Sequence, residues 1–175
     1  FMKTKINDLK SYSNHLNLKS ESNSLFVLLR QIFLTFGSEG IQIVSDEMIM
    51  SLIQAPITNE FKDFIITFCT MFSDDYLNRN QKLTLSKRLK TELSTRNPLY
   101  ALQIIAEIPP VCLVNHNEIL DALLLLKKSV SKQIRVAISP AIFNVGRLCE
   151  NITHEFIVGE MFRIALYDHA LEVRV

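Results

Sequence analysis

Residues 117–148 read NEILDALLLLKKSVSKQIRVAISPAIFNVGRL. Apolar side chains recur at every third or fourth position over 119–128, and the same spacing returns over 134–148. This spacing places the apolar side chains on one side of a helix. The polar stretch between the two runs is short, and Asn117 belongs to a residue type that commonly caps helices. The stretch therefore predicts two antiparallel helices joined by a tight turn.

The same spacing extends outward along most of the chain, and Gly37 and the proline after Ala55 mark two of its interruptions. It predicts helices over 23–36, 45–54, 58–72, 80–93, 97–108 and 153–167, a weaker one near 9–18 and another beginning at Ala170. The 175 residues contain only four glycines and five prolines, and their apolar residues are mainly Leu, Ile, Ala and Phe. This composition argues against an all-β fold, so the predicted class is all-α.

A repeat with a period in the upper thirties accompanies these helices. The tripeptide ending in Val136 is Ile-Arg-Val, and a similar Val-Arg-Val ends 39 residues later at Val175. Cys112 and Cys149 are 37 residues apart, as are several pairs of apolar positions. Two helices fall within each period, and each pair has an apolar side that only neighbouring pairs can cover. The period predicts an α-solenoid of stacked antiparallel helix pairs.

The last period carries a motif that resembles the signature of HEAT repeats. Asp168 followed by Val173 and Arg174 is similar to the pattern D-x-x-x-x-V-R of that family. In HEAT repeats the aspartate lies in the turn within the repeat, and the arginine lies early in the second helix. The two residues form a ladder along the stack. The resemblance is strongest over 117–175, and the 39-residue step looks most like the scaffolding subunit of type-2A protein phosphatases.

Earlier repeats resemble this motif in part. Ser129 stands where the aspartate is expected, five residues before an Ile-Arg step that contains Arg135. Lys62 follows Phe61 as a weaker form of the V-R step, and Pro98 interrupts the ladder in the repeat between. The resemblance implies that the structural ladder consists of Lys62, Arg135, Asp168 and Arg174.

The resemblance also implies an organisation and a function. It implies a right-handed superhelical stack of HEAT-like or armadillo-like pairs over 23–175, after a capping or poorly ordered segment over 1–22. The last repeat is incomplete, so we expect the chain to be a piece of a longer array. Such repeats are non-catalytic scaffolds for protein–protein interactions, and the implied partners are a phosphatase catalytic subunit or its regulators. The turns within the repeats would hold the partner through Lys127, Lys128, Lys132, Asp168 and His169.

Two other classes of function stay open. One is a nuclear-transport or nucleic-acid-associated helical-repeat adaptor. A formal charge of +1, from nineteen Lys and Arg against eighteen Asp and Glu, argues against it because binding to phosphate backbones normally requires a basic surface. The other is a compact all-helical enzyme domain.

The sequence contains no recognisable catalytic, metal or cofactor motif. The four histidines are scattered, and the four glycines form no phosphate-binding loop. We therefore expect no catalytic residue, no metal, no cofactor and no small-molecule substrate. The three cysteines lie in apolar stretches without metal-ligand spacing, and no apolar run approaches the roughly 20 residues that span a bilayer. These features favour reduced core thiols, no membrane span and a cytoplasmic or nuclear protein.

Overall fold

The computed structural model describes residues 22–42, 44–72, 76–149 and 153–167. These residues form nine α-helices and one 3₁₀-helix, and they contain no strand. The all-α class predicted from the sequence is confirmed. The elements are α2 (Ser22–Phe36), α3 (Ser38–Ile41), α4 (Asp46–Gln54), α5 (Asn59–Phe72), α6 (Arg79–Leu93), α7 (Leu99–Glu107), η1 (Pro110–Cys112), α8 (His116–Leu126), α9 (Lys132–Gly146) and α10 (His154–Tyr167).

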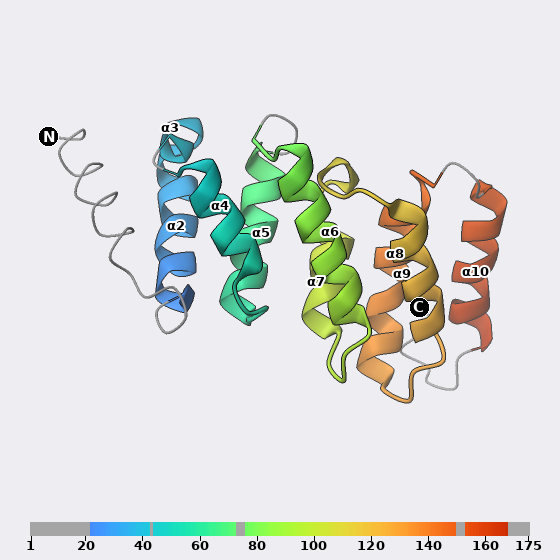
Figure 1. Cartoon of the computed structure of the whole chain (residues 1–175). Coiled ribbons are helices and arrows are strands. Elements are labelled where there is room, and N and C mark those ends of the chain that lie inside the picture. The colour runs from blue at the N-terminus through green and yellow to red at the C-terminus, as the bar shows by residue number, and fades with distance from the viewer. Residues whose placement is uncertain (1–21, 43, 73–75, 150–152, 168–175) are drawn as a thin grey trace, which may run out of the picture.

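The helices are arranged in two layers and follow one another along the molecule in chain order (Figure 1). In one layer α2 packs on α5, α5 on α7, and α7 on α9. In the other layer α4 packs on α6, and α6 on α8. The pairs α6–α7 and α8–α9 connect the layers, and α10 packs on α9. From α4 to α7, each helix therefore contacts the helix two places further along the chain.

Phenylalanines fill the core between α2 and α5. Phe26 meets Phe61 edge to face at 5.4 Å, and Phe33 meets Phe72 in the same way at 5.3 Å. Positions 61, 64, 68 and 72 all carry Phe, and the spacing of three or four residues brings these rings to one side of α5. Burying one such ring stabilises the fold by about 1.5–3 kcal/mol, so this cluster fixes α2 on α5.

The predicted helices that fall within the described residues are all present, and their ends differ from the prediction by at most two residues. Gly37 ends α2 as predicted, with φ of 54° and an N–H that donates to the Phe33 carbonyl at 2.8 Å. The expected cap at Asn117 is wrong, because α8 begins at His116 after Asn115, whose φ is 58°. The short α3 and η1 were not predicted. The helices expected near 9–18 and from Ala170 lie outside the described residues.

No helix among the described residues is both long and apolar enough to cross a bilayer. The three cysteines are buried and carry no disulfide, as the apolar character of their surroundings predicted.

Candidate interaction surface

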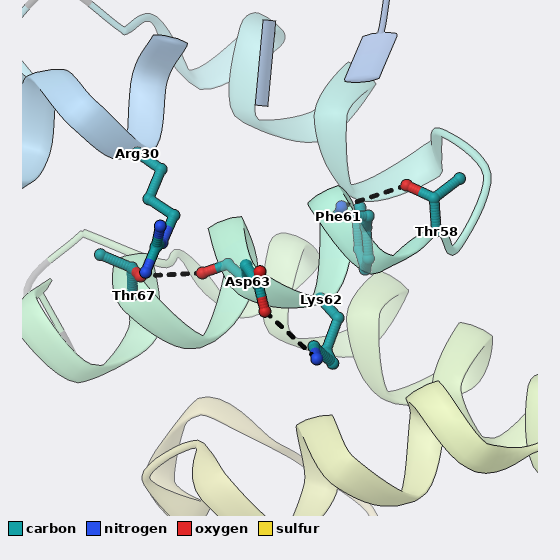
Figure 2. A network of polar contacts seen from close by, with 6 residues as sticks. All are labelled: Arg30, Thr58, Phe61, Lys62, Asp63 and Thr67. Atoms are coloured by element: carbon teal, nitrogen blue, oxygen red, sulfur yellow. Dashed lines mark hydrogen bonds and ion pairs between the residues drawn. The ribbon is translucent and has the colours of Figure 1, made fainter. Parts of the chain in front are cut away.

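A row of polar contacts crosses three helices of the first layer. The Nε of Arg30 on α2 donates to Thr67 Oγ1 on α5 at 3.1 Å, and the Thr67 hydroxyl donates to the Asp63 carbonyl at 2.8 Å (Figure 2). The side chain of Asp63 makes a further contact, because its carboxylate pairs with Nζ of the adjacent Lys62 at 3.2 Å (Figure 2). The Lys62 ammonium also lies 5.9 Å from the centre of the Tyr100 ring on α7. This row links α2, α5 and α7 through side chains at the margin of the core.

The start of α5 is fixed by Thr58. Its hydroxyl oxygen accepts the Phe61 N–H at 3.2 Å, as an N-cap does (Figure 2). The same hydroxyl donates to Asn23 Oδ1 on α2 at 2.9 Å. The helix start predicted at Thr58 is therefore also a contact between neighbouring helices. Both functions of this hydroxyl orient α5 against α2.

The solvent-facing side of α9 carries an apolar stripe. Val136 and Phe143 are 43% and 51% exposed, and Pro140 between them is exposed too. Their spacing of four and three residues puts the three side chains on one face of the helix. On the opposite face Ile138, Ile142 and Val145 are buried. The helix thus buries apolar side chains on one face and exposes apolar side chains to solvent on the other.

The lysines expected to hold a partner differ in their surroundings. Lys127 Nζ pairs at 2.6 Å with Glu160 Oε2 of α10, a carboxylate that is 6% exposed and also pairs with Arg163 at 3.1 Å. Lys127 therefore links the end of α8 to α10. Lys128 and Lys132 are exposed on the turn between α8 and α9. Asp168 and His169 lie outside the described residues.

The residues of the expected ladder are only partly described. Arg135 Nη1 donates to the carbonyls of Ser129 and Val130 at 2.8 and 2.9 Å, so it fastens the turn that precedes its own helix. Here Ser129, which stands in the aspartate position of the motif, contributes its backbone oxygen. Lys62 makes the contacts with Asp63 and Tyr100 given above, and Arg174 lies outside the described residues along with Asp168.

Two polar side chains that the sequence did not single out as caps, the buried Asn144 and the half-buried Arg88, cap helices in the neighbouring pair. Asn144 on α9 donates its Nδ2 to the carbonyls of Ile105 and Ile108 at 2.8 and 2.7 Å, at the end of α7. Arg88 on α6 donates to the Ile53 carbonyl in the last turn of α4. The last carbonyls of a helix have no partner within it, so both side chains satisfy groups that would otherwise be unpaired. Burial lowers the pKa of the Arg88 guanidinium, which also lies 5.4 Å from the Phe61 ring.

Polar contacts between neighbouring helix pairs recur at sequence separations close to the predicted period. Gln81 donates to the Asp46 carbonyl across 35 residues at 3.2 Å, and this buried glutamine is also part of the box that caps α6. Further contacts near this period span 33 to 39 residues and join Arg30 to Thr67, Thr58 to Asn23, Arg88 to Ile53, Lys127 to Glu160, and Asn144 to Ile105 and Ile108. Two others, from Lys90 to Glu118 and from Val114 to Ser86, span 28. A polar residue among the apolar positions of a helix, as at Gln81 and Asn144, is the feature of the sequence that could have indicated these contacts.

A hollow of about 370 Å³ lies at the start of α8 and is lined by Asn115, His116, Asn117, Glu118 and Leu148. His116 Nε2 lies 3.0 Å from the Pro110 carbonyl. A hydrogen bond from Lys90, at 2.5 Å, lowers the pKa of Glu118, which favours its carboxylate form. Among the described residues no group of three or more His, Cys, Asp or Glu side chains lies close enough to hold a metal ion. The lining thus provides solvated polar groups at a turn.

Comparison of the chain with protein families, characterised proteins and solved structures found no match. We therefore infer the function from the geometry of the chain itself.

Proposed function

We propose that the chain is a non-catalytic scaffold for protein–protein interactions, built as a right-handed HEAT-like α-solenoid. The alternation of helices between two layers supports this architecture, because each helix from α4 to α7 contacts the one two places along. The polar contacts across 33 to 39 residues support it independently, since they connect positions one repeat apart. The resemblance of the Asp168 motif to HEAT repeats suggests the family.

The observation that carries the function is the exposed apolar stripe of α9, formed by Val136, Pro140 and Phe143. Exposed aromatic and aliphatic side chains on a rigid helix are the kind of anchor that contributes most to protein binding. The neighbouring turn places Lys128 and Lys132 beside the start of α9, where they provide a charged rim. The partner we propose is a protein phosphatase catalytic subunit or one of its regulators, in the cytoplasm or nucleus.

The test is a binding titration of purified type-2A phosphatase catalytic subunit on the immobilised chain by biolayer interferometry. We expect the double variant Val136→Ser, Phe143→Ser to weaken Kd by at least about tenfold, because truncating central anchors costs more than about 1.4 kcal/mol. The matched control is Leu125→Ser on α8, whose side chain is 79% exposed outside the stripe. We expect this control to leave Kd unchanged.

The possible failures are distinct. If the unaltered chain does not bind the phosphatase subunit, the proposed partner class is wrong. If the α9 variant and the Leu125 variant bind as tightly as the unaltered chain, the α9 surface is wrong. Circular dichroism of each variant checks that the helices are retained.

A further inference from the structure

Two cysteines from successive helix pairs meet in the core. Cys69 lies near the end of α5 and Cys112 at the end of η1, and both are fully buried. The Cys112 thiol donates to the Cys69 carbonyl oxygen, with 4.0 Å between the sulfur and the oxygen, so the two residues lie next to each other in the core. By contrast, the Cys149 thiol donates to the Val145 carbonyl of the preceding turn, at 3.6 Å. Cys69 and Cys112, which are 43 residues apart in the sequence, are thus neighbours in the core.

The surroundings of the pair keep it protonated in the closed fold. The hydrogen bond with Cys112, followed by burial, raises the pKa of the Cys69 thiol well above its ordinary value. The charge of Lys82 on α6 acts weakly in the opposite direction. Because the thiolate is the nucleophile, the pair reacts slowly while it is closed.

Exposure of the Cys112 thiol requires local opening of the segment that carries it, in which Cys112 and Leu113 are buried. This segment is a single 3₁₀ turn between Pro109 and the start of α8, so it can move without breaking a long helix. Outside its own turn it is held by the Val114 N–H, which donates to Ser86 Oγ at 2.9 Å. A second contact joins His116 Nε2 to the Pro110 carbonyl at 3.0 Å.

We propose that Cys69 and Cys112 are a redox pair, which hydrogen peroxide converts into an intramolecular disulfide. In the first step one thiolate attacks a peroxide oxygen, the O–O bond breaks, and a sulfenic acid and water form. In the second step the other thiol attacks the sulfenic sulfur and releases a second water. The two sulfurs lose two electrons in total, and the peroxide gains them. The product links α5 covalently to the segment after α7.

The experiment treats the reduced full chain with hydrogen peroxide, blocks the remaining thiols with N-ethylmaleimide in denaturant and measures the intact mass. The expected product carries one maleimide where the reduced chain, with three cysteines, carries three. Peptide mapping should show a linked pair that contains Cys69 and Cys112. Cys149→Ser should leave the rate of linkage unchanged, and Cys112→Ser should abolish the intramolecular linkage.

A second pair of variants tests the opening step. Ser86→Ala removes the acceptor of the Val114 N–H, and we expect it to speed linkage several-fold. Thr91→Ala on the same helix removes an exposed hydroxyl that bonds only to its own helix, at the Lys87 carbonyl, and should leave the rate of linkage unchanged.

Two results would overturn the proposal that Cys69 and Cys112 form a redox pair. They are disulfides that contain Cys149 and oxidation beyond sulfenic acid without linkage. Linkage only in denaturant would overturn it as well, and equal rates for both variants would overturn the role of Ser86. Mapping of the unaltered chain keeps the test valid if a cysteine variant does not fold.

Discussion

Individual polar side chains in the core set how neighbouring helix pairs meet. Asn144 and Arg88 each cap the end of a helix in the preceding pair, Asn144 from a buried position and Arg88 from a half-buried one. A buried amide or guanidinium is costly unless its hydrogen bonds are made, so only one relative placement of the helices satisfies them. These residues therefore specify the register between pairs, while the apolar residues provide most of the stabilisation.

Asn144→Ala tests this role. The substitution leaves the carbonyls of Ile105 and Ile108 without their donor, and we expect the free energy of unfolding to fall by about 2–3 kcal/mol. Urea denaturation followed by circular dichroism measures the change. The matched control is Asn80→Ala on the exposed side of α6, which we expect to change stability by less than about 0.5 kcal/mol. Equal effects of the two substitutions would contradict the capping role.

The raised pKa of Cys69 gives stability a dependence on alkaline pH. The folded state holds the Cys69 proton more tightly than the unfolded state does, so its contribution is complete below the unfolded pKa of about 8.5. As pH rises further, the unfolded state loses this proton first, and stability falls by up to about 1.4 kcal/mol per pH unit. Urea denaturation between pH 8 and 10 should show this decline, and Cys69→Ala should reduce it. An identical pH profile for the variant would argue against this assignment.

At the scale of the elements, the sequence predicted helices well and their ends less well. Apolar spacing identified each long helix because a helix of this fold buries one face, and that face is visible in the sequence. The helix predicted over 80–93 starts at Arg79, and its capping box of Asn78 and Gln81 was not predicted because the polar α6 offers little apolar spacing to mark its start. The turn η1 was missed because Pro109 and Pro110 indicated only where α7 ends.

The candidate surface was less accessible to prediction. The prediction that Lys127 holds a partner stays a prediction, and the sequence did not indicate that its ammonium pairs with Glu160, 33 residues further along. A contact of this kind depends on how α10 lies against α8 and α9, and no local pattern reports it. The stripe of Val136 and Phe143 was also missed, because apolar residues on both faces of α9 do not reveal which face is covered.

Two glycines in the last helices make a matched test of how closely α9 and α10 approach. A Cβ at Gly146 would lie 2.7 Å from Ile157 Cδ1 and 3.0 Å from its Cγ1, whereas a Cβ at Gly159 would meet nothing within 4 Å. We expect Gly146→Ala to lower the free energy of unfolding by about 1 kcal/mol through overpacking. Gly159→Ala should raise it by about 0.5–1 kcal/mol, because alanine favours the helix. Thermal denaturation of both variants measures the difference, and shifts of the same sign would contradict the close approach.

For the molecule as a whole, the order in which the helices contact one another determines how stability is distributed along the chain. The main packing contacts among the described helices join elements close in chain order, and no single helix contacts all the others closely. In such an arrangement, stability is a sum of the contributions of the pairs and the interfaces between them. The helices with partners on several sides should then be the most protected. One of these is α7, which packs on α5, α6 and α9 and has four fully buried side chains.

Amide hydrogen exchange measured by mass spectrometry should reflect this arrangement. We expect exchange to be slowest in α7 and faster in α2 and α10, where Val27 and Phe162 are 58% and 59% exposed. Phe33→Ala removes a ring that packs against α5, and should speed exchange in α2 and α5 while leaving α9 unchanged. If exchange accelerated equally in every helix, the chain would unfold as one cooperative unit. That result would contradict the repeat architecture, because a stack of pairs transmits a local defect only to its neighbours.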